Sequence, residues 1–236
     1  ALSPAGRALL PDMRRLVALY EQMQAQAPAQ DAMAGTVQLG AIVSAVRPLI
    51  EATLALKSRH PALDLHVSAA KSADLLQRVA DGALQAAVVV REPAQGRAAT
   101  QLAWSPLYEE PMVLLAHRAV EAASPRALLQ RHPFIRFDRS EHTGQLVERT
   151  LRRLRARPED FLELNAIEAI VELVRSGLGV AIVPLLREAR WAADPRLRVI
   201  ELPRAEARQI ALAHRRGAAS TAVIAAVARE LQGQPP

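Results

Sequence analysis

Hydrophobic and polar positions alternate in a regular way along this chain from residue 36 onward. Three apolar runs have the length of strands, namely TVQLGAI, LDLHVSA and LQAAVVV. The segments between these runs repeat apolar residues every three or four positions, which is typical of amphipathic helices. Two successive strand–helix–strand units predict a parallel sheet with right-handed crossovers.

Three residues mark the predicted ends of these helices. Ser44 and Ser72 stand directly before the two helical segments, so we predict that their side chains cap the helix N-termini. Gly82 follows the second segment, where a helix needs a left-handed C-cap. In the first helix, one apolar stripe is expected to comprise Val46, Leu49, Ile50, Thr53, Leu54 and Leu56.

The first residues carry a separate helical pattern. Apolar residues at spacings of three and four predict one amphipathic helix over 4–27, with Pro11 as a bend or a late start. These residues are Leu9, Leu10, Met13, Leu16, Val17, Tyr20 and Met23. Residues 28–35 are typical of a linker. A helix joined to the next domain by a loop must bury its stripe elsewhere, and a second copy of the chain is the simplest partner.

Prolines punctuate the second half of the chain. The run over 102–117 contains Pro106 and Pro111, which predicts a strand that leaves one sheet and starts another. Asn165, followed three residues later by Glu168, is a capping-box pattern for a helix over 166–176. Further helices are predicted over 124–132, 145–156 and 185–192 and from Ser220, and further strands over 133–138, 161–165, 179–184, 197–203 and 208–215.

The Gly-Leu-Gly at 177–179 has two interpretations. In a dinucleotide-binding fold, such glycines follow a strand and open a helix. Here the predicted order is helix, glycine, strand, and a third glycine is missing. We therefore predict that Gly177 is the left-handed residue that ends a helix, and that Gly179 permits a close backbone approach at the start of a strand.

Composition and charge favour a globular α/β protein. Half of the residues are hydrophobic and 3% are aromatic, a balance that suits helices and parallel strands filled by Ala, Val and Leu. The formal charge of +6 comes almost wholly from arginine, since Lys57 and Lys71 are the two lysines. The arginines are spread along the chain, and those of RTLRRLRARP fall on more than one helix face, which is typical of a solvated surface and not of a nucleic-acid interface.

The sequence offers little for catalysis or for a metal or other cofactor. There is no cysteine, which excludes disulfides, thiolate nucleophiles and cysteine-bound metals. The six histidines lack metal-ligand spacing, and neither Gly-x-Ser-x-Gly nor His-Glu-x-x-His occurs. No secretory signal and no apolar run of about 18 residues is present, so we expect a cytoplasmic protein. The start at ALSPAG indicates a chain whose N-terminal part is missing.

Taken in order, the segments resemble the regulatory part of LysR-type transcriptional regulators. The resemblance rests on LSPAGRALL, GTVQLGAI with Ser44 after it, HPALDLHVSAAKSADLLQRVADGALQAAVVV, EEPMVLLAH and IEAIVELVRSGLGVAIVP. It covers nearly the whole chain. One departure is Gln85-Ala86-Ala87, where the family usually has a strand start that contains Asp.

The resemblance implies an α/β fold with two Rossmann-like lobes joined by two crossover strands, as in type 2 periplasmic binding proteins, preceded by a long N-terminal helix. Residues 1–34 would be a linker and dimerisation helix, 35–106 plus 209–236 the first effector-binding lobe, and 107–208 the second. The chain would form a homodimer or a homotetramer. It would contact DNA through a winged helix-turn-helix that precedes it in such regulators.

The same resemblance places candidate ligand contacts at a cleft between the lobes. Ser44 and Ser72 open helices whose free N–H groups suit a carboxylate, and Lys71 adds a positive charge; the alternatives are simple caps and a solvated lysine. In the second lobe the candidates are Arg136, Phe137, His142 and Thr143, with an ordinary surface loop as the alternative. Asn165 is expected to be a cap first and a ligand contact second.

These expectations define the leading hypothesis, a domain that senses a small organic anion for a transcriptional regulator. The alternative is a solute-binding protein of the same fold that serves transport. An enzyme built on this fold is a third reading, for which the sequence provides no specific motif. A pairing such as Ser44 with His142 has nothing specific to support it.

Overall fold

The computed structural model describes residues 33–92, 101–121, 123–202, 204–217 and 221–233, together with Leu9, Asp12, Met13 and Val17. These four N-terminal residues are helical. The rest of the helix predicted over 4–27 lies outside the described residues, as do Pro203 and Ser220. The long N-terminal helix and its pairing with a second copy therefore stay predictions.

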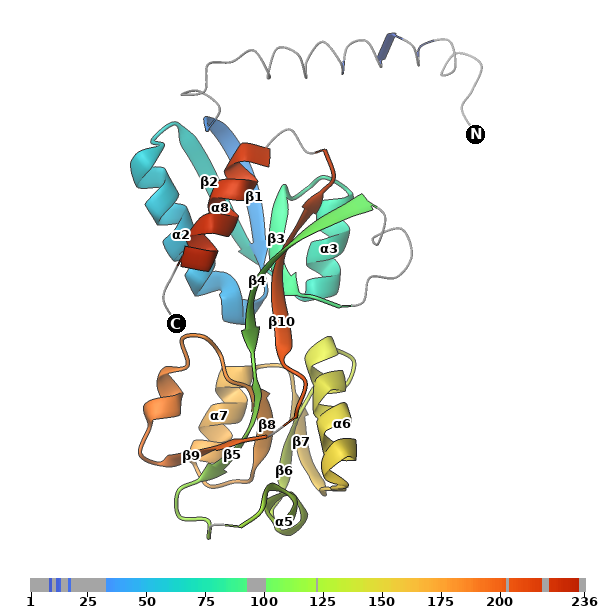
Figure 1. Cartoon of the computed structure of the whole chain (residues 1–236), viewed down its shortest axis with the longest axis vertical. Helices are drawn as coiled ribbons and strands as arrows, with labels where there is room; N and C mark the ends of the chain where they lie inside the picture. Colours follow the sequence, from blue (N-terminus) through green and yellow to red (C-terminus); the bar gives the residue numbers. More distant parts are fainter. Residues whose placement is uncertain are drawn as a thin grey trace.

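Five strands form the larger sheet, in the order β2-β1-β3-β10-β4 (Figure 1). β1 pairs in parallel with β2 and with β3, which confirms the predicted parallel core, while β10 runs antiparallel to β3 and β4. The strands are β1 (Gly35–Ala41), β2 (Leu63–Ala69), β3 (Ala86–Val90), β4 (Leu102–Glu110) and β10 (Arg208–Arg215). The helices of this part are α2 (Val46–Arg59), which follows the short helix η1 (Val43–Ala45), α3 (Ser72–Ala80) and α8 (Thr221–Gly233).

The second half of the chain builds a separate set of strands. β5 runs antiparallel to β8 and β9, β6 runs parallel to β7, and a bridge between Phe134 and Val180 links the two groups. The strands are β5 (Met112–His117), β6 (Phe134–Phe137), β7 (Asp160–Leu164), β8 (Ala181–Pro184) and β9 (Leu197–Glu201). The helices are α5 (Pro125–Arg131), α6 (His142–Leu154), α7 (Ile167–Arg175) and the short η2 (Arg190–Ala193).

Buried apolar side chains form two hydrophobic clusters, one around each set of strands. We call the elements around the first cluster lobe I and those around the second lobe II; the two lie above and below one another in Figure 1. β4 lies in the sheet of lobe I and β5 in that of lobe II, with Pro111 between them, so the predicted change of sheet within 102–117 is confirmed. The predicted limits of the lobes as domains stay a prediction.

The glycine pair after α7 lies in the predicted order of helix, glycine and strand. Gly177 has φ +77°, and the N–H of Leu178 donates to the carbonyl of Leu173 at 3.1 Å, which closes the helix. A Cβ on Gly179 would lie 2.4 Å from the carbonyl oxygen of Pro133. Both predictions are confirmed, and these glycines serve the fold.

Three predicted helix caps are wrong. The N-cap positions of α2, α3 and α7 are Ala45, Lys71 and Ala166, and no described side chain caps any of the three by a hydrogen bond. The Ser44 hydroxyl instead accepts a hydrogen bond from Arg208, and the Ser72 hydroxyl accepts one from the backbone N–H of Val90 at 3.2 Å. Each of these serine hydroxyls is hydrogen-bonded to a residue far along the chain, and a local sequence pattern does not reveal such a partner.

Two hydrophobic patterns also misled the sequence analysis. In α2, Ile50 and Leu54 are exposed, because Ala52 and Thr53 share the buried face with Leu49 and Leu56. The helix predicted over 185–192 is wrong apart from its end, where one short 3-10 helix spans Arg190–Ala193. The first residues after β8 instead form turns.

Candidate functional site

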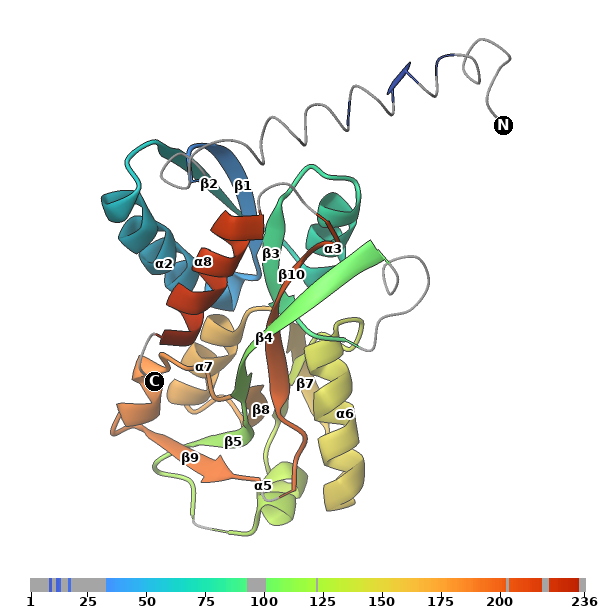
Figure 2. The same ribbon diagram turned by 45° about the horizontal axis from the view of Figure 1, so that its top comes forward.

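A cavity of about 560 Å³ lies between the two lobes. Lobe I contributes the turns that follow β1 and β2, and lobe II contributes the segments that follow β6, β7 and β8. The carboxyl ends of parallel strands are the usual place for ligands in α/β proteins. β4 and β10 pass between the lobes (Figure 2). Tyr108 and Glu110 of β4 and Arg208 of β10 line the cavity.

Six of the eight predicted contact residues line this cavity, and they come from both lobes. They are Ser44, Lys71, Ser72, Phe137, Thr143 and Asn165. Phe137 and Thr143 are buried in the wall, whereas Lys71 and Asn165 are exposed. Six residues chosen from the sequence therefore share one cavity, although the two serines are not helix caps; that these residues contact a ligand stays a prediction.

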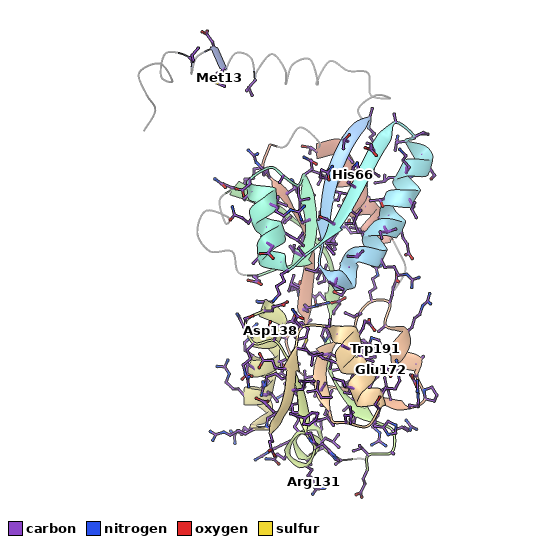
Figure 3. All side chains as sticks on the ribbon, turned by 180° about the vertical axis from the view of Figure 1, so that it is seen from behind. Met13, His66, Arg131, Asp138, Glu172 and Trp191 are labelled. Atoms are coloured by element: carbon purple, nitrogen blue, oxygen red, sulfur yellow. The ribbon has the colours of Figure 1, made fainter. Side chains whose placement is uncertain are left out.

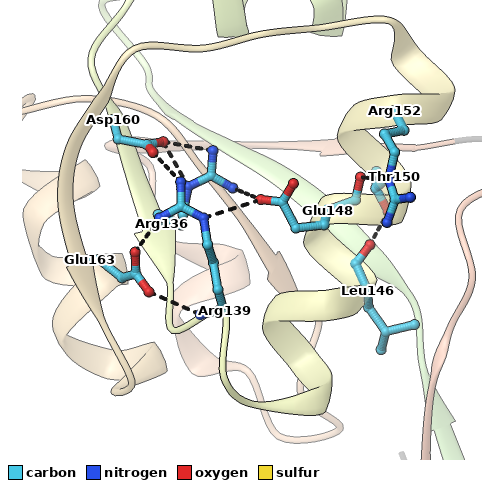
Figure 4. Close-up of polar contacts among 8 residues, drawn as sticks. All are labelled: Arg136, Arg139, Leu146, Glu148, Thr150, Arg152, Asp160 and Glu163. Atoms are coloured by element: carbon cyan, nitrogen blue, oxygen red, sulfur yellow. Dashed lines mark hydrogen bonds and ion pairs between the residues drawn. The ribbon is translucent and has the colours of Figure 1, made fainter.

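Arg136 does not line the cavity. Its side chain is buried, with Nε donating to Asp160 Oδ1 at 2.7 Å and Nη1 paired with Glu148 (Figure 4). Its guanidinium also lies over the ring of Phe134, 4.9 Å from the ring centre. Because these partners occupy the guanidinium, the structure corrects the prediction, and Arg136 serves the packing of lobe II.

His142 also lies outside the cavity wall. It is the first residue of α6 and is half-buried. Burial lowers the pKa of His142, and the nearby charge of Arg149 lowers it further. The lowered pKa keeps the ring neutral at pH 7. Because His142 does not line the cavity, the structure corrects its placement among the ligand contacts.

Sequence reasoning missed a buried ion pair in the cavity wall. Arg208 Nε donates to Glu110 Oε2 at 2.7 Å, and each side chain is 3% exposed. Arg208 Nη2 also donates to Ser44 Oγ at 3.0 Å. Glu110 and Arg208 are partners in the β4–β10 register, so only the strand pairing reveals them as a pair.

Burial dominates the electrostatics around this pair. It raises the pKa of Glu110, although Arg208 and the backbone N–H of Arg187 act in the opposite direction. Burial, together with the charge of Glu110, raises the pKa of Tyr108 to about 12, so its hydroxyl stays protonated. The Arg187 guanidinium lies 5.1 Å from the centre of the Tyr108 ring. The cavity thus has an aromatic wall that carries a neutral hydroxyl.

Ion pairs at the rim join the two lobes. Lys71 of lobe I lies 3.1 Å from Glu141 Oε1 and 3.4 Å from Asp138 Oδ2 of lobe II, and Glu141 raises the pKa of Lys71. Arg47 of lobe I lies 3.2 Å from Glu188 Oε2 of lobe II. Figure 3 shows Asp138 at the end of lobe II that faces lobe I. Exposed pairs of this kind are weak because water screens their charges, so they can break when the lobes move.

The cavity wall carries an excess of positive charge. Its cationic residues are Arg47, Lys71, Arg175, Arg187, Arg190 and Arg208, and its acidic residues are Glu110, Glu141, Glu168 and Glu188. Within the described part of the chain, no group of His, Asp or Glu side chains is arranged to hold a metal ion. None of the described helices is both long enough and apolar enough to cross a bilayer.

Comparison with known proteins identifies the kind of domain this is. The LysR substrate binding domain family matches residues 30–235. The HTH-type transcriptional regulator YofA of Bacillus subtilis is 27% identical over 184 residues, which cover 78% of this chain and 62% of that protein. CbbR of Xanthobacter flavus, also an HTH-type transcriptional regulator, is 26% identical over 206 residues, which cover 84% of this chain and 60% of that protein.

Solved structures share the fold. A Corynebacterium glutamicum OxyR C206 mutant matches with a TM-score of 0.71 and 21% identity, covering 98% of this chain and 74% of that one. The CcmR regulatory domain of Synechocystis PCC6803, in complex with 2-PG, matches with a TM-score of 0.72 and 17% identity, covering 86% of this chain and 100% of that one. These matches confirm the predicted α/β fold class. The chain spans about three fifths of the length of the curated relatives it matches.

Proposed function

Because the chain belongs to the LysR substrate-binding domain family, we propose that it senses a small organic anion for a LysR-type transcriptional regulator, and that the anion binds between lobe I and lobe II. The charge of the cavity carries this proposal. Six cationic residues face four acidic ones in the wall, and two turns that lead into helices, at Ser44 and Ser72, open onto the same space. Helix N-termini and arginines both suit carboxylate oxygens.

Binding would couple the two lobes. A ligand that touches Ser44 or Ser72 in lobe I and Thr143 in lobe II favours one relative orientation of the lobes over others. The rim pairs of Lys71 and Arg47 are weak enough to adjust to that orientation. The alternative of transport is not favoured, since the curated relatives are transcriptional regulators.

We assign DNA contact to the part of such regulators that lies outside these 236 residues, and we propose that they act in the cytoplasm.

Self-association of the chain fits the apolar side chains that stay exposed. Ile50 and Leu54 are 42% and 64% exposed on α2, and Phe161 and Leu162 are 59% and 43% exposed on β7. Exposed apolar groups of this size favour a homodimer or homotetramer.

Calorimetric titration and thermal shift with benzoate, hexanoate, adipate and isophthalate test the anion proposal. We expect at least one of these probes to raise the unfolding temperature, because a ligand that binds the folded state stabilises it. Ser44→Ala and Thr143→Val should reduce that shift, whereas His142→Gln, outside the cavity wall, should leave it unchanged. A shift that survives both cavity changes would refute this site. The bound probe should be recovered unchanged, as expected for a sensor and not an enzyme.

A further inference from the structure

One end of the cavity contains hydrogen-bond donors without acceptors. Among the described residues, three buried side-chain nitrogens have no hydrogen-bond partner, namely Arg175 Nε, Trp191 Nε1 and Arg198 Nη1. Arg175 and Trp191 both line the cavity. Buried donors without acceptors are rare in folded proteins, and two of them in one cavity wall call for an explanation.

The same end opens onto a second, more exposed hollow. Arg175, Arg190 and Trp191 line both the cavity and this hollow of about 460 Å³, and we call these three residues the Trp191 end. Trp191 is 4% exposed, and Figure 3 shows it beside α7, near Glu172. A ligand that extends to the Trp191 end would therefore meet the Arg190 guanidinium and the indole of Trp191.

Positive charge at the Trp191 end is only partly neutralised. Arg175 pairs with Glu172 and lies 2.9 Å from Asp194 Oδ2, but its Nε makes no hydrogen bond to that oxygen. Arg196 also engages Asp194, through its backbone N–H at 2.9 Å and through its side chain. Arg190 has no side-chain hydrogen bond or ion pair within the described part of the chain.

The carboxylate of Glu168 lines the cavity and has no ion pair with any described residue. It lies in the first turn of α7, where free backbone N–H groups and the helix dipole stabilise a negative charge. Glu168 therefore does not require a cation from the ligand.

We infer that the ligand carries two separated anionic groups, one held near Ser44, Ser72 and Thr143, and a second, carboxylate-like group held at the Trp191 end. This inference rests on the proposed function and names the chemical class of its ligand. Arg190 would supply the opposite charge, and a small shift of the buried Trp191 indole would let its Nε1 donate to an oxygen of the second group the hydrogen bond that it lacks. A monoanion would leave these donors unsatisfied.

Paired probes that differ by one carboxylate group test the inference. The dissociation constants of adipate and hexanoate, and of isophthalate and benzoate, are measured by calorimetry on the full chain. We expect each dianion to bind at least about tenfold more tightly than its monoanion, because one charge-assisted contact is worth roughly that factor. In Arg190→Gln and in Trp191→Phe this ratio should fall toward one. The matched control is Arg126→Gln, an exposed arginine of α5 outside both walls, which should keep the full ratio.

Trp191→Phe has a second readout that separates binding from folding. The substitution keeps an aromatic ring and removes the unsatisfied N–H, which offsets part of the cost of the lost ring volume, so the ligand-free variant should stay folded and unfold at most a few degrees below the original chain. Equal affinities for dianion and monoanion, or a ratio that persists in both variants, would overturn the second anionic group and leave the proposed function intact. Failure of all four probes to bind would count against both the second anionic group and the proposed function.

Discussion

Glu110 and Arg208 face one another across β4 and β10 at the point where the chain passes between the lobes, and each side chain is 3% exposed. Arg208 extends the contact to Ser44, at the end of lobe I that faces the cavity. One buried pair thus connects the two crossing strands to the candidate ligand site. A ligand that touches Ser44 would act directly on the junction of the lobes.

Removal of one partner of this pair should be costly. Glu110→Gln leaves the Arg208 charge buried without a counter-charge, which we expect to lower the free energy of unfolding by about 3–5 kcal/mol. The double change Glu110→Leu with Arg208→Met should cost far less, because no charge stays buried. Urea denaturation at pH 7 measures both. A double variant as unstable as the single one would show that an unpaired buried charge is not the cause of the lost stability.

The two glycines after α7 provide a matched pair for a packing test. Gly179→Ala places a Cβ 2.4 Å from the Pro133 carbonyl oxygen, a backbone atom, so we expect a loss of about 3 kcal/mol. Gly177→Ala meets no described atom within 4 Å, and its cost is that of a left-handed backbone, about 1 kcal/mol. Urea denaturation of both variants checks that Gly179→Ala lowers the free energy of unfolding more than Gly177→Ala does. Equal decreases would contradict the close approach at Gly179.

His142 should make stability depend on pH in a defined direction. Its folded pKa lies below the ordinary value of 6.5, so below that pH the unfolded chain binds a proton that the folded chain excludes. Stability is therefore present above pH 6.5 and is lost as the pH falls. His142→Gln should reduce the loss between pH 7 and pH 5, measured by urea denaturation at each pH. An unchanged loss would assign the effect to other groups.

Arg136 tests whether a residue outside the cavity wall affects ligand binding. Arg136→Met removes the buried partner of Asp160 and Glu148, which stay paired with Arg139, so stability should fall by about 1–2 kcal/mol. Affinity for any anion that binds the intact chain should change less than twofold at a temperature where the variant is folded, because Arg136 does not line the cavity. A large loss of affinity measured by calorimetry would restore Arg136 as a contact.

Periodicity alone was enough to predict most of the strands and helices, whereas the two-lobed arrangement was implied by the family resemblance. The strands β1, β2 and β3 coincide with three apolar runs, and Pro111 marks the change of sheet. The pattern failed at Ile50 and Leu54, because a hydrophobicity count ranks them above the smaller Ala52, which α2 buries beside the predicted Thr53. Burial of a helix face depends on what packs against it, and neighbouring residues do not show that.

The candidate site was predictable only where it follows from chain order. Ser44 and Ser72 come directly after parallel strands, and that position alone brings them to the cavity. Arg136 looked similar, but its charge is satisfied by Asp160, a partner on the neighbouring strand β7. Glu110 and Trp191 gave no local signal, because their roles arise from the pairing of β4 with β10 and from the turns after β8.

Glu168 and Lys71 should act on anion binding in opposite directions. Glu168→Gln removes a negative charge from the cavity wall, so affinity for a carboxylate should rise by roughly two- to fivefold at low salt. Lys71→Gln removes a positive charge from the same wall and breaks the rim pairs with Glu141 and Asp138, so affinity should fall by a similar factor.

Both changes in affinity should shrink as the salt concentration is raised, because Glu168 and Lys71 are exposed and ions screen such charges. Calorimetric titration of isophthalate at about 50 mM and about 500 mM salt measures these changes. If Glu168→Gln weakens binding, the ligand presents a cation to α7, and the anionic ligand class must be abandoned.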